Sequence, residues 1–177
     1  PVFTVCFSNH TGYGAWRGPL MTGENVRDIV TGIDERDGLR DVQFVLSGYQ
    51  GGNDIGDAIL DSVEMVKRRN PNALYACDPV LGNAKSGCFV AQEVQDLIRD
   101  RVVPKADIIT PNQFELGFIT DTSPLTLEET LESVELARAM GPRVVLVTSV
   151  ERPDRPENTI EMLAVTDQGA WIVQTPH

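Results

Sequence analysis

Short apolar runs alternate with longer amphipathic stretches along most of the chain. The runs typical of buried strands are 42–46 (VQFVL), 73–77 (ALYAC), 107–109 (DII) and 144–147 (VVLV). Between them, apolar residues recur every three or four positions, as they do on one face of a helix. Thr126 and Glu129 have the spacing of a capping box, which marks a helix start. This alternation predicts right-handed βαβ units, and so an α/β fold with a mainly parallel sheet and helices on both faces.

The pattern differs at the two ends of the chain. Residues 2–7 have the character of a strand and follow directly after Pro1. Residues 160–165 and 170–175 are strand-like and flank a short polar turn, which predicts a β-hairpin. No repeat or long linker divides the 177 residues, so we expect residues 1–177 to form a single domain that is incomplete at both ends.

The charge balance argues against some classes of partner. Lysine and arginine number 15 and aspartate and glutamate 26, which gives a formal net charge of -11. Because no basic run offsets this charge, we expect neither nucleic acid nor an anionic membrane as a partner. The three cysteines include no C-x-x-C pair and indicate neither a disulfide framework nor a zinc site, which favours a cytoplasmic protein. No apolar run approaches the roughly 18 residues of a membrane span.

Polar residues follow three of the predicted strands. Asp78 follows the second run, Thr110, Asn112 and Glu115 follow the third, and Thr148 follows the fourth. Taken alone, Asp78 is equally consistent with a turn cap, and Glu115 with a solvated residue at a helix start. The carboxyl ends of parallel strands meet at one edge of a sheet, where open α/β folds bind ligands. Together these residues therefore predict a ligand site, with carboxylates suited to a cation or a metal-bound phosphate.

Residues 7–16 (FSNHTGYGAW) have a different character. They combine hydroxyl groups, an imidazole and aromatic rings in one loop, which suits a polar aromatic ligand. The alternative is a turn whose aromatic rings pack into the core, and for His10 alone we favour a structural role. The glycines at 51 and 52 match neither phosphate-binding fingerprint, so they predict a turn that lets Tyr49 face the ligand.

Five motifs occur in the order FSNHTGYG, LSGY, CDPVLG, TPNQFEL and VLVTS. Their order and separations resemble those of the pyridoxal kinases of the ribokinase superfamily, over essentially the whole chain. The resemblance implies a ribokinase-like three-layer sandwich that phosphorylates the 5'-hydroxymethyl group of pyridoxal and related B6 vitamers with ATP. Two alternatives remain open: a hydroxymethylpyrimidine-type vitamin kinase, which shares the TPNxxE and DPV motifs, and a non-catalytic binding module.

The resemblance also implies roles for individual residues. The positions that match substrate contacts are Ser8, Thr11, Gly12 and Tyr49. The positions that match ATP contacts are Asp78, Thr110, Asn112, Glu115 and Thr148. Asp78 and Glu115 are the implied metal ligands, and the implied cofactors are ATP, Mg²⁺ and a monovalent cation such as K⁺. The role of Asn83 stays open, and the expected assembly is a homodimer.

Two family features have no counterpart among these residues. The family carries a substrate-binding serine on a strand that precedes the first residue here, and a G-x-G-D segment that follows the position of His177. That second segment supplies the general base and an anion hole at a helix N-terminus. The resemblance therefore implies no catalytic base within residues 1–177, and we expect these residues alone to be inactive.

Overall fold

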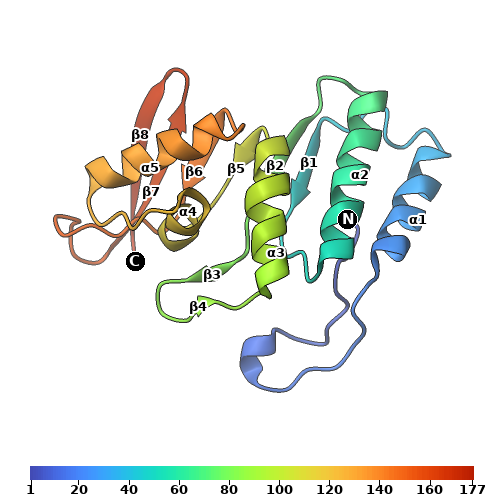
Figure 1. Ribbon diagram of the computed structural model, residues 1–177, viewed down its shortest axis with the longest axis horizontal. Coiled ribbons are helices and arrows are strands. Elements are labelled where there is room, and N and C mark those ends of the chain that lie inside the picture. Colours follow the sequence, from blue (N-terminus) through green and yellow to red (C-terminus); the bar gives the residue numbers. More distant parts are fainter.

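The computed structural model describes residues 1–177 and contains one six-stranded sheet with the strand order β1-β2-β5-β6-β7-β8. The strands of this sheet are β1 (Phe44–Ser47), β2 (Leu74–Cys77), β5 (Ile108–Ile109), β6 (Val144–Val147), β7 (Thr159–Thr166) and β8 (Gly169–Pro176). The first four are parallel to one another, and β7 and β8 are antiparallel to their neighbours (Figure 1). The predicted mainly parallel α/β sheet with a hairpin at its end is confirmed.

Five α-helices accompany the sheet. They are α1 (Gly23–Asp34), α2 (Asn53–Arg69), α3 (Gln92–Leu97), α4 (Gln113–Thr120) and α5 (Leu127–Ala139). Three shorter helical segments are also present. They are the 3-10 helices η1 (Thr11–Tyr13) and η3 (Val103–Lys105) and the π-helix η2 (Ile98–Val102). The capping box predicted for the last helix is confirmed: Thr126 accepts a hydrogen bond from the Glu129 backbone, and Glu129 accepts one from the Thr126 backbone. None of the helices combines the length and apolar character needed to cross a membrane.

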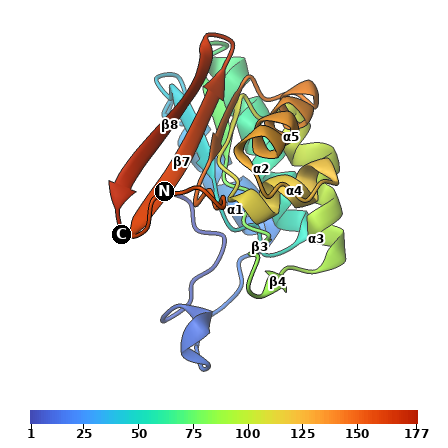
Figure 2. The same cartoon turned by 90° about the vertical axis from the view of Figure 1, so that its left-hand side faces the viewer.

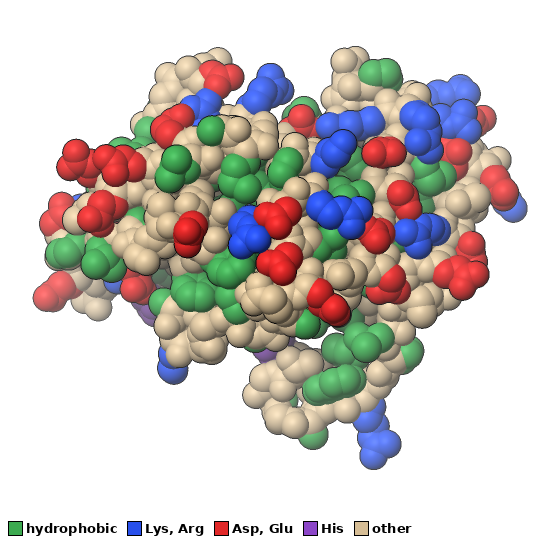
Figure 3. All heavy atoms as spheres, viewed as in Figure 1, with side chains coloured by type: hydrophobic (Ala, Val, Ile, Leu, Met, Phe, Trp, Pro, Cys, Tyr) green, Lys and Arg blue, Asp and Glu red, His purple; other side chains and the backbone are tan.

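All five helices lie on the same face of the sheet (Figure 2). The parallel strands advance in one direction across the sheet, so right-handed crossovers carry every connecting helix to the same side. One cluster of 24 buried residues joins the sheet to these helices. The outer surface of the helices carries acidic and basic side chains with hydrophobic ones between them (Figure 3). Helices were predicted on both faces, and within residues 1–177 only one of these two helical layers is present.

The opposite face of the sheet, which we call the open face, is apolar. Its residues include Phe44, Leu46, Leu146, Trp171 and Val173. In β6, Leu146 alternates with the core residues Val145 and Val147, whereas β8 is exposed along its whole length. The strand register places Leu146 beside Ala164 and Ala164 beside Trp171, so the face continues across strands. The exposed fraction reaches 67% for Leu46 and 51% for Val173.

Two segments differ from their predicted structure. Residues 2–7 do not join the sheet; they pair with residues 17–21 through a bridge between Val5 and Leu20, and form an arm that projects from the body (Figures 1 and 2). Their extended conformation therefore serves the pairing with residues 17–21 and not the central sheet. Residues 82–88 lie outside every predicted strand, yet they form a small hairpin of β3 (Gly82–Asn83) and β4 (Gly87–Cys88). Gly82 permits this pairing, because a Cβ there would lie 2.2 Å from the Gly87 carbonyl oxygen.

Candidate functional site

Three neighbouring parallel strands end side by side at the carboxyl edge of the sheet. The register pairs Cys77 with Ile109 and Ile109 with Val145, so the polar residues that follow each strand are brought together. The Thr110 amide donates to the Cys77 carbonyl at 3.0 Å, which holds Thr110 beside the start of the Asp78 turn. The arm and the β3–β4 hairpin project from this same edge (Figure 1).

The end of β6 joins this edge through the turn that precedes α4. The Thr148 amide donates to the Pro111 carbonyl at 2.9 Å, and Asn112 and Thr148 form a parallel bridge. The five residues that the sequence predicts for this edge therefore lie close together, although they come from three separate connections. This arrangement is typical of open α/β sheets, whose ligand sites consist of residues that are far apart in sequence.

Glu115 is 5% exposed and holds two of these connections together. Its Oε1 accepts hydrogen bonds from the amides of Leu81 at 2.9 Å and Gly82 at 3.2 Å, and its Oε2 accepts one from the Asn112 amide at 2.9 Å. Asn112 reciprocates by accepting from the Glu115 amide and donating its Nδ2 to the Gly82 carbonyl at 2.8 Å. Glu115 thus caps α4 and fixes the turn that follows Asp78.

Two carboxylates at this edge have raised pKa values. Burial raises the pKa of Glu115, the backbone N–H donors oppose that rise, and the nearby Asp78 charge adds to it. Burial also raises the pKa of Asp78, and the Thr110 hydroxyl acts in the opposite direction. Two neighbouring carboxylates that resist ionisation gain from a cation that binds between or beside them.

Asp78 and Glu115 differ in how well their carboxylates could serve as ligands of a hard cation. Asp78 is half-buried and belongs to no ion pair, so its oxygens are available as ligands. Glu115 already accepts three backbone hydrogen bonds, which leaves roughly one of a carboxylate's four acceptor sites. Asp78 therefore fits a direct ligand of Mg²⁺, whereas Glu115 fits a residue that orients the turn carrying it.

The predicted substrate residues lie mainly on the arm. Ser8, Thr11 and Gly12 are exposed, and their hydrogen bonds stay within the arm, as when the Arg17 amide donates to the Ser8 Oγ at 3.0 Å. His10 accepts a hydrogen bond from the Gly12 amide at 3.0 Å and caps η1. No hydrogen bond joins the three to the strand ends.

Tyr49 provides the connection between the arm and the sheet edge. It follows β1, is 38% exposed, and its carbonyl accepts a hydrogen bond from the Thr4 hydroxyl at 2.8 Å. Asn83 lies in the hairpin turn and accepts from the amides of Lys85 and Ser86, both at 3.0 Å. These contacts account for a turn-forming role of Asn83.

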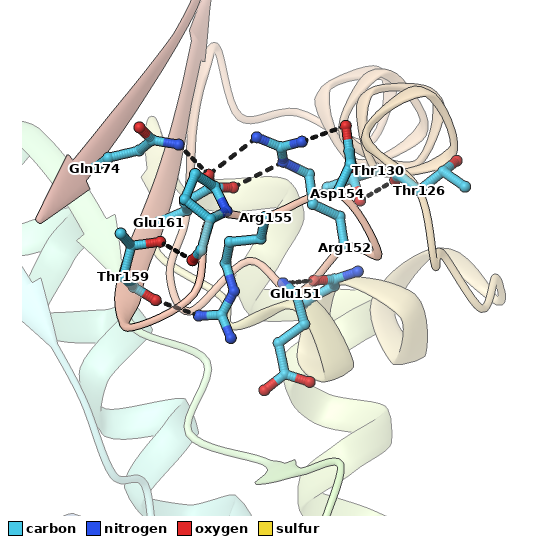
Figure 4. Close-up of polar contacts among 11 residues, drawn as sticks. Thr126, Thr130, Glu151, Arg152, Asp154, Arg155, Thr159, Glu161 and Gln174 are labelled. Atoms are coloured by element: carbon cyan, nitrogen blue, oxygen red, sulfur yellow. Dashed lines mark hydrogen bonds and ion pairs between the residues drawn. The ribbon is translucent and has the colours of Figure 1, made fainter. Parts of the chain in front are cut away.

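The sequence analysis did not predict a polar cluster that lies between β7 and the segment after β6 (Figure 4). Glu161 on β7 is fully buried and is held by Arg152, which follows β6 at a distance of four residues from Thr148. Glu161 alternates with the buried Leu163 and Val165, so it occupies a core-facing strand position. A charged residue at such a position is the sequence signal that could have identified the cluster.

The fold and the polar strand ends define an α/β protein with a candidate ligand site at the carboxyl edge of its sheet. The model of the phosphomethylpyrimidine kinase family matches residues 55–177, and the chain belongs to this family. The chain is 69% identical over 176 residues to pyridoxal kinase PdxY of Leifsonia xyli, and 54% identical to pyridoxal kinase PdxY of Corynebacterium diphtheriae. Each alignment covers 99% of this chain and 62% of the relative, so the chain spans less than two thirds of these relatives.

Solved structures agree with the sequence relatives. Pyridoxal kinase from Leishmania donovani in complex with ADP and pyridoxamine superposes with a TM-score of 0.88 at 26% identity, covering 99% of this chain and 63% of that one. A putative phosphomethylpyrimidine kinase from Bacteroides thetaiotaomicron, in a crystal form with pyridoxal, gives 0.84 at 28% identity over 98% of this chain and 60% of that one. The expected resemblance to pyridoxal kinases is confirmed.

Proposed function

We propose that the complete protein transfers the terminal phosphoryl group of ATP to the 5'-hydroxymethyl group of pyridoxal and related B6 vitamers. The observation that carries the proposal is 69% identity to a curated pyridoxal kinase over 176 residues. The Asn112–Thr148 bridge supports it, because it joins two of the polar strand ends into one edge. We further propose that residues 1–177 belong to one domain, since a single cluster of 24 residues forms most of the core.

The nucleotide side of the proposed site consists of the strand ends. Thr110, Asn112 and Thr148 bind and orient the ATP phosphates, and Asp78 holds Mg²⁺. Glu115 keeps the Asp78 turn in place through its three backbone hydrogen bonds. When bound, Mg²⁺ neutralises charge on the phosphates, which is the main requirement of phosphoryl transfer. A monovalent cation such as K⁺ belongs to the same proposal.

The vitamin side consists of Tyr49 and the arm. We propose that Tyr49 and the arm residues Ser8, Thr11 and Gly12 contact the vitamin ring. The hydrogen bond from the Thr4 hydroxyl to the Tyr49 carbonyl supports this, because it connects the arm to Tyr49. The relatives are longer than this chain, and we propose that the general base and the anion hole come from residues outside 1–177. A cytoplasmic location belongs to the same proposal.

A homodimer belongs to the same proposal. The arm exposes large apolar side chains, among them Phe3 at 61%, Tyr13 at 82% and Leu20 at 60%, and such patches mark contact surfaces. The arm supports contact with a second copy or a cover over the substrate. Light scattering of the complete protein should give the dimer mass, and a monomer would count against the assembly.

The experiment that tests the function follows pyridoxal 5'-phosphate formation by the complete protein with magnesium ATP. We expect Asp78→Asn to raise the Mg²⁺ requirement and to lower turnover about tenfold or more, which corresponds to about 1.4 kcal/mol. Asp61→Asn is the matched control, because Asp61 pairs with Arg27 on the helix surface and is 54% exposed. Absence of activity in the wild type would refute the function, and an unchanged Mg²⁺ requirement in Asp78→Asn would refute the metal assignment.

A second candidate is a kinase for a pyrimidine alcohol. It is favoured by the family model, whose description is phosphomethylpyrimidine kinase. The two candidates share the nucleotide side and differ at Tyr49 and the arm. The ratio of kcat/KM for pyridoxal and for hydroxymethylpyrimidine, measured on the same preparation, separates them.

A further inference from the structure

Glu161 is a buried carboxylate that the proposed reaction does not use. Its side chain is fully buried, and the Arg152 guanidinium grips it with two bonds, Nε to Oε2 at 2.8 Å and Nη2 to Oε1 at 3.0 Å (Figure 4). Gln174, which lies opposite on β8, donates a further hydrogen bond to Oε1. The forked guanidinium fixes both the distance and the orientation of the two side chains.

The segment that carries Arg152 is attached on two sides. Toward α4, the Thr148 amide donates to the Pro111 carbonyl at 2.9 Å and the Glu151 amide donates to the Gln113 Oε1 at 2.5 Å. Toward β7, the Val150 amide donates to the Glu161 carbonyl at 2.9 Å. Residues 148 and 151 therefore bind the start of α4 and the turn before it, whereas residues 150 and 152 bind β7.

Ser149 shows that this path is constrained. Its φ angle is 51°, in the left-handed region that non-glycine residues seldom adopt, and it lies next to Thr148. Such a conformation persists where contacts on both sides hold it. Here the flanking contacts are the Thr148 amide bond to Pro111 and the Val150 amide bond to Glu161.

A buried ion pair supplies orientation more readily than stability. Removing two charges from water costs much of what their attraction returns, so apolar replacements of such pairs are often as stable as the original. What an apolar pair does not reproduce is the forked geometry. The Arg152–Glu161 pair is therefore suited to fixing the position of the segment that follows β6.

We propose that Arg152 and Glu161 are positioning residues for the nucleotide side of the site, and that they act by fixing residues 148–152 so that Thr148 faces Thr110 and Asn112. The inference rests on the proposed function. Neither residue touches the phosphates in this proposal. The competing view is that the pair only holds β7 to its neighbours.

The test uses the complete protein and compares single with paired substitutions. Arg152→Met and Glu161→Gln each leave a buried partner without its counterpart and should lower the melting temperature. The double variant R152M/E161Q removes both charges and should recover most of that loss. We expect its KM for ATP to stay raised about tenfold, with the KM for pyridoxal within about twofold of the wild type. Recovery of the KM for ATP together with stability would overturn the proposal.

Two further variants control for charge and exposure. Asp154→Asn removes a carboxylate that contacts the same guanidinium at 2.6 Å but is 79% exposed, and should leave both KM values unchanged. Arg152→Lys keeps the charge facing Glu161 and loses the fork, so its KM for ATP should lie between those of the wild type and R152M. An unchanged KM for ATP in Arg152→Lys and in R152M would contradict the positioning role.

A cycle with Thr148→Val tests whether the effect passes through Thr148. If it does, adding Thr148→Val to R152M/E161Q should raise the KM for ATP by much less than it does in the wild type. Additive effects would refute that route. Calorimetric titration with magnesium ADP repeats the comparison without turnover. A wild type that forms no pyridoxal 5'-phosphate defeats the proposed function, whereas unchanged ADP affinity in the double variant defeats this inference.

Discussion

The sheet has one face covered by helices and one open face, and the same strands supply both. In β6, Val145 and Val147 are fully buried beneath the helices, whereas Leu146 between them lies on the open face and is partly exposed. In β1, Leu46 is 67% exposed although it is as apolar as the residues of the core. Apolar character thus identifies strands, but it does not identify which of their two faces other elements cover.

The cause of the difference lies in the connections. Each parallel crossover moves in the same direction along the sheet, so α2, α3, α4 and α5 are all carried to one side. The open face receives no helix from residues 1–177. Exposed apolar surfaces of this kind mark contact surfaces, so mutations on the two faces should have different consequences.

The largest expected effect concerns activity when residues 1–177 are prepared alone. Loss of a general base costs about 10²- to 10⁴-fold and loss of anion-stabilising donors about another 10²- to 10³-fold, so we expect no detectable kinase activity. The open face should also bind an apolar dye strongly. Pyridoxal 5'-phosphate formation and dye fluorescence, each compared with the complete protein, check both statements.

The outcome also tests where the chemistry resides. Activity of residues 1–177 within about tenfold of the complete protein would place the catalytic base among these residues. Equal dye binding by the two preparations would show that the open face stays exposed in the complete protein.

A pair of leucines measures the two faces directly. Leu163 is 1% exposed on the helix-covered face, and Leu163→Ala should lower the free energy of unfolding of residues 1–177 by about 2–5 kcal/mol. Leu46→Ala on the open face should lower it by about 0.5 kcal/mol or less. Urea denaturation gives both values. Equal losses of unfolding free energy would contradict the difference between the two faces. If Leu46→Ala costs more unfolding free energy in the complete protein than in residues 1–177, further residues cover the open face.

The smallest expected effect is a difference in pH dependence between two buried carboxylates. The hydrogen bond from Arg152 lowers the pKa of Glu161 against the effect of burial, so its stabilising contribution is lost as pH falls through the folded pKa. Burial raises the pKa of Glu115, so the unfolded chain ionises first and stability is lost as pH rises through the folded pKa.

Urea midpoints measured between about pH 3 and pH 7 should separate the two residues. Glu161→Gln should flatten the loss of stability on the acid side, and Glu115→Gln should flatten the loss above the ordinary glutamate pKa. Since the two effects have opposite signs, a change of slope in the same direction for both variants would contradict the assignment.

Local patterns predicted the elements they directly specify. The run at 144–147 has the same bounds as β6, and the capping signature at Thr126 marks the true start of α5. Asn112 likewise caps α4, because its side chain accepts a hydrogen bond from the amide of Glu115, three residues further along the chain. Such signals work because the interacting groups are neighbours in sequence.

Other features depended on distant partners. The strand-like residues 2–7 pair with residues 17–21 instead of entering the sheet, and the β3–β4 hairpin depends on a close approach at Gly82. The predicted edge residues do lie together, while Ser8, Thr11 and Gly12 stay on the projecting arm. Their roles in binding remain predictions.

The sequence by itself determined the alternation of strands and helices, the helix caps and the polar residues at the strand ends, because periodicity and capping act over a few residues. Only the tertiary structure decided which face of the sheet the helices cover and what surrounds each buried carboxylate. Glu115 meets the Leu81 amide across 34 positions and Glu161 meets Gln174 across 13. Contacts of that range are set by the register of strands and the handedness of crossovers, which no local pattern encodes.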